Sequence, residues 1–424
     1  MKKALILSLV MVMIMSLSAF ATSTRTLTLG QNNNVLLDDN NVWLYPSRVF
    51  QYPNIATGEF ARNNGYSQSY NNNFYNFGVN WKFGEKKPWV LGTYFSTVQN
   101  VGPTLLELGN PGGYQVPGFY WYDDYAKTSS DPYIPDNSTS TDKRMDLLYA
   151  RQFGKYTFGW GFSYTRGSIK SDTTTDKSEA KFGYYGFTWS LTPDNGQWDV
   201  ALMTNFGTFG TKDPDGLDLV KGDGYTDFGV QGRYFWKYNN TITFVPHAGV
   251  AFGSHGVKYL NDDSTSYQNT KTKRTAFELG SGMNYSPVNK VLGVLDFGFA
   301  YEKVKYEGAD NGGYTAYNES ESQLFFPYWR VGVEGEVFNW MTLRLGATSN
   351  WTIYKWKGNG PYTDKYAENN TYLGVGLNFN RLHIDTYMDP QIVLHGFDFI
   401  SGNNSYYSAS PDLNFHVSVL YDMF

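Results

Sequence analysis

The 424-residue chain contains no cysteine. A disulfide framework, a cysteine-ligated metal site and a thiol nucleophile are therefore excluded, and so is a lipoprotein anchor, which needs a cysteine to carry its lipid. The histidines are few and scattered and leave little for catalysis; they are His247, His255, His383, His395 and His416. We therefore expect no metal, no other cofactor and no enzymatic activity.

Charged residues are also scarce. They make up 17% of the chain, against about 25% in an average soluble domain. The formal net charge of −5 argues against nucleic-acid binding, which requires a basic face. After the first 21 residues no stretch approaches the ~18 apolar residues of a transmembrane helix, and the mean hydropathy is −0.45. Aromatic residues are abundant instead, at 18%, and so is glycine, with 44 residues. This composition favours strands with aromatic side chains on a broad outer surface.

The first 21 residues have the pattern of an export signal. Lys2 and Lys3 precede an apolar stretch, and Ala19-Phe20-Ala21 matches the small-residue cleavage site. We expect cleavage after Ala21, so that the mature chain begins at Thr22. The alternative is an uncleaved membrane anchor.

Apolar and polar residues alternate with a period of two over much of the chain. Residues 75–83 and 156–165 are clear examples, and segments 341–347, 373–379 and 413–423 repeat the pattern. Successive side chains of a strand point to opposite faces, so each segment has one apolar face and one face rich in Gly, Asn, Ser and Thr. A soluble β-sandwich alternates in the same way, so this pattern alone does not distinguish the two.

The links between these segments alternate between short and long, as in outer-membrane barrels with short periplasmic turns and long extracellular loops. The short links lie near residues 84–87, 154–155, 192–197, 238–240, 286–289, 338–339 and 381–382. The long ones span roughly residues 100–141, 171–176, 212–223, 261–270, 307–321, 358–365 and 397–410. We predict an all-β, transmembrane, up-and-down antiparallel barrel over residues 54–424. It has about 16 strands, or 14 if the first hairpin, which begins with residues 54–62, is not part of the wall.

Aromatic residues bracket five of the short turns. Tyr and Trp prefer the membrane–water interface, where a ring is half buried and still able to form hydrogen bonds. The alternative is that the rings cap a soluble core. The bracketing pairs are Phe83 and Trp89, Phe153 and Tyr156, Trp189 and Trp198, Trp236 and Tyr238, and Phe338 and Trp340.

Charged residues fall mostly on the polar face of the predicted strands, which in a barrel faces the lumen. A lipid-facing Arg or Lys at mid-membrane costs about 2–4 kcal/mol. Across the turn at 338–339, the two possible registers set either Glu334 or Glu336 opposite Arg344. The set functions either as a constriction that selects solutes or as a network that stiffens the wall. The predicted lumen network comprises Arg144, Arg233, Asp296, Arg330, Glu334, Glu336, Arg344 and Asp385, and Asp146 and Asp199 share its face.

The longest predicted loop carries an unusual cluster of aromatic residues followed by two acids. Its candidate ligand contacts are Phe119, Tyr120, Trp121, Tyr122, Asp123 and Asp124. The cluster forms a ligand surface, a lid over the barrel mouth, or a packing contact with the rim. A loop of this length is usually functional or disordered. A second loop, which begins at Asp213, contains several acids but lacks the spacing of an EF-hand, so a solvated turn is preferred there over a calcium site.

Two short segments resemble known outer-membrane sequences. Residues 38–47, DDNNVWLYPS, resemble the stretch that precedes the barrel in fatty-acid-transporter-like (FadL-like) proteins. That resemblance implies that residues 22–53 plug the lumen and that the solutes are long-chain hydrophobic molecules. The final residues, 421–424, resemble the signal read by the outer-membrane assembly machinery, with Phe424 as the terminal aromatic.

The sequence therefore predicts a protein of the bacterial outer membrane. Its expected partners are outer-membrane lipid and lipopolysaccharide, the assembly machinery through Phe424, and a small-molecule solute. We expect passive uptake of that solute, through an open lumen or past the N-terminal segment. The alternative is a non-conducting barrel used for surface binding, adhesion or secretion.

Overall fold

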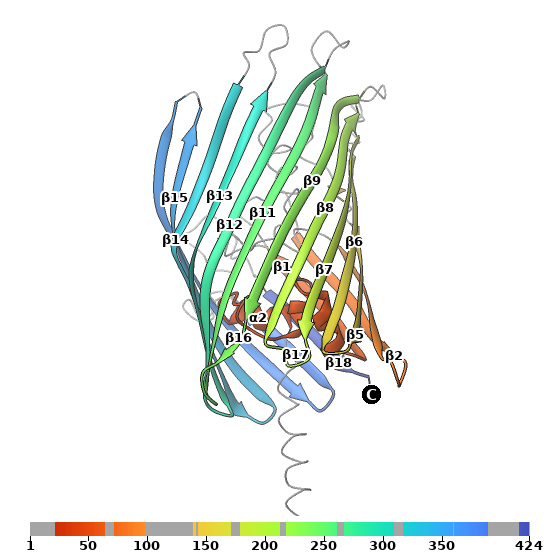
Figure 1. Cartoon of the computed structure of the whole chain (residues 1–424), viewed down its shortest axis with the longest axis vertical. Coiled ribbons are helices and arrows are strands. Elements are labelled where there is room, and N and C mark those ends of the chain that lie inside the picture. The colour runs from red at the N-terminus through yellow and green to blue at the C-terminus, as the bar shows by residue number, and fades with distance from the viewer. Residues whose placement is uncertain are drawn as a thin grey trace, which may run out of the picture.

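A computed structural model describes most of the chain between Thr22 and Met423 (Figure 1). The described residues are 22–63, 72–97, 139–140, 143–170, 179–212, 218–260, 267–308, 317–358, 360–388 and 415–423. Several predicted features lie outside these ranges: the cleavage site at Ala19 and Ala21, the aromatic cluster from Phe119 to Asp124, the calcium candidate at Asp213, and Phe424.

Sixteen antiparallel strands form a closed barrel. They are β1 (Ile55–Asn63), β2 (Asn72–Phe83), β3 (Trp89–Thr97), β5 (Lys143–Phe153), β6 (Tyr156–Lys170), β7 (Glu179–Pro193), β8 (Trp198–Lys212), β9 (Asp218–Tyr234), β11 (Ile242–Leu260), β12 (Tyr267–Val288), β13 (Val291–Gly308), β14 (Tyr317–Phe338), β15 (Met341–Lys357), β16 (Tyr362–Phe379), β17 (Leu382–Met388) and β18 (Phe415–Asp422). The barrel closes because β1 pairs with both β2 and β18. Two short segments, β4 (Thr139–Ser140) and β10 (Trp236–Lys237), pair with β6 and β11. The prediction of a sixteen-stranded barrel is confirmed, including the first hairpin.

Four strands that follow long links begin earlier in the chain than the sequence predicted. Strands β9, β12, β14 and β16 begin at Asp218, Tyr267, Tyr317 and Tyr362, inside segments that were expected to be loops. The first residues of β12, YQNTKTKRT, explain the error. Both of their faces are polar, so the period of two disappears from the sequence although the backbone pairing with β11 and β13 continues. As a result the wall is tall on the side of β11–β15 (Figure 1).

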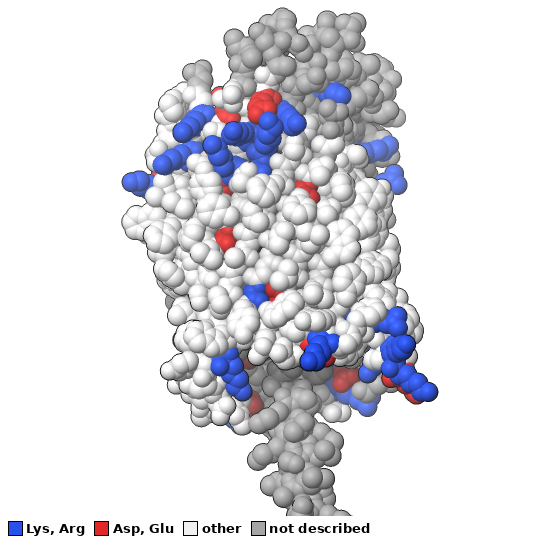
Figure 2. Space-filling view, in the orientation of Figure 1, with Lys and Arg blue, Asp and Glu red and all other residues white. Residues whose placement is uncertain are grey.

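The outer surface carries a broad band that is nearly free of charge (Figure 2). Its apolar side chains are exposed, such as Phe297 at 49% and Leu345 at 60%, as expected for a surface that faces lipid. Most of the aromatic residues at the short turns are also exposed, Trp89 and Trp198 being half-buried, and Phe338 stacks on Trp340 with ring centroids 5.5 Å apart. Among the described residues no helix is long and apolar enough to cross a membrane.

Within residues 22–54 the chain forms three short helices: α2 (Ser23–Thr28), η2 (Asp39–Val42) and η3 (Pro46–Gln51). They lie within the barrel, toward the end that carries the short turns (Figure 1). Thr22 caps α2 by accepting a hydrogen bond from the Arg25 backbone N–H at 3.3 Å. After α2 the chain turns at Gly30, whose φ of +78° suits glycine because this residue has no β-carbon.

Candidate functional site

The N-terminal segment, residues 22–53, fills part of the lumen. Between residues 22 and 50, Leu37 alone is exposed, at 42%, and the other residues are buried or half-buried. A 29-residue stretch with so little regular structure becomes buried only by packing against other parts of the chain, and the surrounding surface here is the inner face of the barrel. The candidate site is therefore the contact between this segment and the wall.

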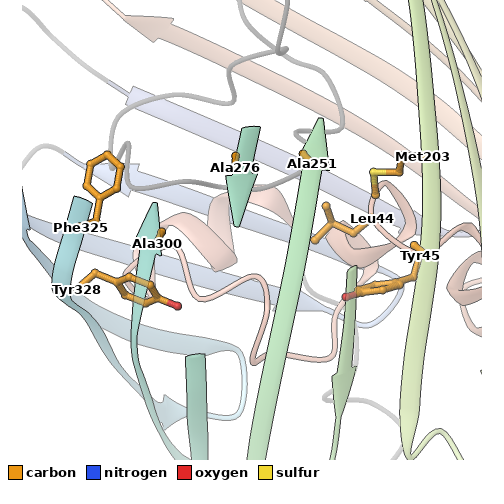
Figure 3. Packing of buried hydrophobic residues seen from close by; sticks show 9 residues of the cluster. Leu44, Tyr45, Met203, Ala251, Ala276, Ala300, Phe325 and Tyr328 are labelled. Atoms are coloured by element: carbon orange, nitrogen blue, oxygen red, sulfur yellow. The ribbon is translucent and has the colours of Figure 1, made fainter. Parts of the chain in front are cut away.

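Apolar residues of the segment pack into three clusters with the inner wall. Leu44 and Tyr45 lie near Met203 and Ala251 in the first, which also includes Ala276, Ala300, Phe325 and Tyr328 (Figure 3). The second joins Val42, Val49 and Tyr52 to Val90, Tyr94 and Leu148. The third joins Leu29, Val35 and Leu36 to Phe235, Val245 and Val294. Burial of such side chains stabilises the contact by roughly 1.5–3 kcal/mol for each large residue.

Glycines on the inner wall make room for the segment. A β-carbon on Gly346 would lie 2.4 Å from the Gly30 backbone nitrogen, and one on Gly332 would lie 2.5 Å from the Leu29 carbonyl oxygen. On the other side of the barrel, a β-carbon on Gly159 would lie 2.0 Å from the Ser47 nitrogen. The glycine-rich polar face seen in the sequence therefore has a structural role here, since it lets two backbones approach closely.

Arg25 of α2 joins an ionic cluster on strands β14, β15 and β17, which we call the Glu334 cluster. Its guanidinium donates two hydrogen bonds to the Glu334 carboxylate, from Nε at 2.7 Å and from Nη2 at 2.8 Å. Arg344 donates to the same carboxylate at 2.6 Å and also to Asp385. The Thr22 hydroxyl donates to the other Asp385 oxygen at 2.7 Å. Two residues of the segment are thus held by a wall triad of Glu334, Arg344 and Asp385.

Arg48 of η3 joins a second cluster on the opposite flank, the Asp199 cluster. It donates to both Asp199 carboxylate oxygens, at 2.8 and 3.0 Å. Arg233 donates to the same carboxylate at 2.8 Å, and Thr192 donates to it at 2.6 Å. The side chains of Asp199 and Arg233 are both completely buried, and that of Arg48 is 2% exposed. The carboxylate therefore lies between one cation of the wall and one of the segment.

Arg233 also binds the middle of the segment through its backbone. Its Nη1 donates to the carbonyl oxygens of Asn33, Asn34 and Leu36 at 2.9–3.2 Å, and Nη2 donates to the Asn41 side chain at 2.8 Å. These carbonyls belong to an irregular stretch that lacks helical partners of its own. The guanidinium thus satisfies several buried acceptors at once and ties the turn between α2 and η2 to the wall.

The remaining predicted lumen charges form two smaller groups. Arg144 pairs with Asp146 on its own strand at 2.6 Å and lies over the Trp43 ring. Asp296 faces His247 at 2.9 Å and Arg330 at 3.8 Å. All these side chains lie on the inner face of the wall.

Glu336 does not join the network that was predicted for it. The register sets Glu334, and not Glu336, opposite Arg344. Glu336 pairs instead with Lys290 at 3.0 Å beside two short turns, where both side chains are partly exposed. Two residues that hold the segment, Arg25 and Arg48, were not identified from the sequence. Their signal is visible in hindsight, because they are the only two basic residues of segment 22–53.

Two acids of the segment have no cation paired to them within ion-pair distance among the described contacts. Burial raises the pKa of Asp39 well above its usual range, and the neighbouring Asp38 carboxylate raises it further. Burial also raises the pKa of Asp38, although Arg25 opposes the change. One carboxylate oxygen of each residue has no hydrogen-bond partner. The docked segment therefore favours protonated acids at this point.

Within the described ranges, no three His, Asp or Glu side chains are grouped so that they could hold a metal ion. The charged side chains instead form ion pairs between the segment and the wall. Chemically, the site can hold or release a segment of its own chain.

No family model matches the sequence, and no curated protein matches it. Among solved structures, the chain is similar to CdiB from Acinetobacter baumannii, with 8% identity, a TM-score of 0.40 and coverage of 87% of this chain and 60% of that one. For CdiB from Escherichia coli, the identity is 10% and the TM-score is 0.40, and the match covers 86% of this chain and 62% of that one. For the ferric yersiniabactin uptake receptor FyuA from Yersinia pestis, the identity is 8% and the TM-score is 0.38, and the match covers 87% of this chain and 80% of that one. The chain thus spans about three fifths of the CdiB chains, and the likeness concerns barrel architecture alone.

Proposed function

We propose that this outer-membrane β-barrel is a transport protein of the bacterial outer membrane, closed at rest by residues 22–53, and that it admits small solutes when this plug moves. We call residues 22–53 the plug from here on. The proposal needs a plug that is held firmly and is still able to leave. Both requirements can be examined at the two ionic clusters.

The observation that carries the proposal is that the wall carboxylates bound by the plug also have cations of their own. Asp199 and Arg233 are direct neighbours on β8 and β9, and their side chains are 2.8 Å apart. Glu334 and Arg344 are direct neighbours on β14 and β15, at 2.6 Å. Removing one partner of a buried ion pair costs about 3–5 kcal/mol when a charge is left unpaired. Departure of the plug leaves no such charge on these carboxylates.

The polar character of the inner wall supports the same conclusion. Beside the ionic clusters, Asn80, Asn205, Thr188 and Ser190 are buried on this face. Such groups tolerate water when the plug is absent, whereas a permanent core is generally more stable with apolar residues of similar volume. The apolar clusters explain why the plug docks at all.

The alternative is a permanently closed barrel that serves in surface binding, adhesion or secretion. The three apolar clusters and the close fit of the plug to the wall glycines favour it. A resemblance of residues 38–47 to FadL-like proteins suggests long-chain hydrophobic solutes for the transport function. This suggestion stays a prediction, as does the identity of the solute.

The deciding experiment is single-channel recording in planar bilayers, with mature protein and a variant that lacks residues 22–53. We expect little conductance from the intact protein and steady conductance from the deletion variant. Insertion is verified by protease protection in liposomes and by a heat-dependent gel shift. Steady conductance from both proteins would contradict the plug, and silence from both, with insertion verified, would favour the closed-barrel alternative.

A further inference from the structure

The outer surface carries a group of lysines just beyond the apolar band, on the side of the long links. Figure 2 shows Lys and Arg side chains gathered near the upper end of the visible face, above surface that is nearly free of charge. The strand register brings five lysines of β12, β13 and β15 close together near the ends of these strands at the long links, and we call them the lysine grid: Lys273, Lys303, Lys305, Lys355 and Lys357.

The residues of the grid point outward. On β13, Asp296, Ala300 and Val304 are buried toward the lumen, so the odd-numbered Lys303 and Lys305 face the other way. On β15, the Tyr354 hydroxyl donates to Glu321 across the lumen face, so Lys355 and Lys357 also face outward. On β12, Lys273 is 46% exposed and shares the odd-numbered outward face of that strand.

The grid has two rows that cross neighbouring strands. In the first row, Lys273 is opposite Lys305, and Ser320 of β14 lies between Lys305 and Lys357. In the second row, Ser322 lies between Lys303 and Lys355. Neighbouring strands are about 4.8 Å apart, so the first row extends over roughly 14 Å. The grid therefore presents five ammonium groups with hydroxyl donors between them.

Such a set of like charges destabilises the free surface. Directly opposed residues with the same charge repel each other across a strand pair, as Lys273 and Lys305 do. Glu307 offsets one of these charges through hydrogen bonds with Lys273 at 2.9 and 3.0 Å. That pair is exposed to solvent and therefore contributes little. An external anion that binds several of the lysines would remove the repulsion.

The height of the grid indicates which anion is present there. On β13 the outward side chains from Val291 to Tyr301 are mainly apolar. Ten residue steps of about 3.4 Å, on a strand tilted by about 40°, rise by roughly 26 Å, close to the ~25 Å apolar band of such barrels. Lys303 and Lys305 follow at once and so lie at the level of the headgroups, in the leaflet on the side of the long links.

We infer that the lysine grid binds the phosphate groups of lipopolysaccharide in the outer leaflet. The ammonium groups pair with phosphate oxygens, Ser320 and Ser322 donate further hydrogen bonds, and the lysine stems lie along the upper edge of the apolar surface. The grid is on the outside of the wall, so this inference does not depend on whether the plug moves. It assigns the protein a specific lipid contact in addition to the general affinity of a barrel for a bilayer.

The test compares two triple variants of the mature protein folded in detergent. The grid variant is Lys273→Gln, Lys305→Gln and Lys357→Gln. The control is Lys86→Gln, Lys87→Gln and Lys155→Gln, three exposed lysines at the short turns that change the net charge equally. The probes are purified lipopolysaccharide, the same lipid after enzymatic removal of its phosphates, and vesicles of phosphatidylglycerol, with binding measured by titration and the folded state checked by gel shift.

We expect the grid variant to bind lipopolysaccharide at least about tenfold more weakly, and the control to bind it like the unmodified protein. Removal of the phosphates from the lipid should weaken binding by the unmodified protein to a similar degree. The inference is overturned if phosphate removal has no effect, or if the control loses as much affinity as the grid variant. Equal affinity for phosphatidylglycerol vesicles would also overturn it, because the grid would then be a general anionic-membrane contact.

Discussion

Replacement of Arg25 by methionine should release the first part of the plug while the barrel stays folded. The substitution removes two charge-assisted hydrogen bonds to Glu334, at 2.7 and 2.8 Å. Glu334 keeps its hydrogen bond from Arg344 at 2.6 Å, so no charge on the wall is left unpaired. Methionine is unbranched and flexible, so it fills much of the space of the arginine stem without its charge.

The size of the effect follows from these contacts. Hydrogen bonds to charged groups contribute about 1.5–3 kcal/mol each. The loss of two such bonds is partly offset because the guanidinium, 8% exposed in the docked state, no longer has to be desolvated. A net weakening of about 2–3 kcal/mol corresponds to an increase of roughly 30- to 150-fold in the equilibrium constant for release of α2.

The assay is single-channel recording, in which the ratio of conducting to closed time should rise by that factor. Arg48→Met is the matched comparison, and it should conduct less often than Arg25→Met because η3 ends at Gln51 and β1 begins at Ile55, so the chain holds η3 in place. Arg151→Met, on the outward face of β5, controls for loss of charge. If Arg25→Met stays as closed as the unmodified protein while the deletion variant conducts, Arg25 does not hold the plug.

Three further predictions address the fit, the charge and the lumen. Gly346→Val should displace α2 and raise conductance, whereas Gly335→Val, where a β-carbon meets nothing within 4 Å, should not. Asp39→Asn should strengthen docking at neutral pH. The pKa of Asp39 is raised in the docked state. In the unmodified protein, the contribution of Asp39 to docking therefore decreases as the pH rises above the ordinary Asp pKa of about 3.9. The rate of proteolysis of the plug as a function of pH measures this decrease. Arg344→Ala in the deletion variant should increase cation selectivity, measured as a reversal potential, because Glu334 and Asp385 then face the lumen without their arginine.

The sequence was sufficient to predict the barrel because lipid and lumen impose opposite requirements on the two faces of each strand. Segments 75–83 and 156–165 therefore alternate, and both are strands. The same logic fails beyond the membrane. There both faces of β12 meet polar surroundings, nothing selects for alternation, and the sequence does not reveal that the strand extends to Tyr267.

The candidate site was predictable only where the pairing is local. The turn between β14 and β15 is so short that it left two registers, and both put a carboxylate opposite Arg344. The contact of Arg344 with Asp385 and that of Arg233 with Asn33 could not be derived in this way. They depend on how sixteen strands close and on where an irregular segment lies inside them, and neither is encoded in the period of the strands. Glu336 shows this limit. It is on the same face of β14 as Glu334, but it lies too near the end of the strand to reach Arg344.

The two ends of the plug are held differently, and this suggests an order of release. Helix α2 lies against β15–β18, and η3 lies against β5–β7. Arg233 on β9 donates hydrogen bonds to the residues between the two helices. Release of η3 first would require the chain to bend immediately before β1, where Val49 and Tyr52 are buried together with Ile55. Release of α2 first breaks the contacts of Arg25 and Thr22 and leaves the contacts of η3 intact. The Glu334 cluster is therefore suited to act as the latch of the plug, and the Asp199 cluster as its hinge.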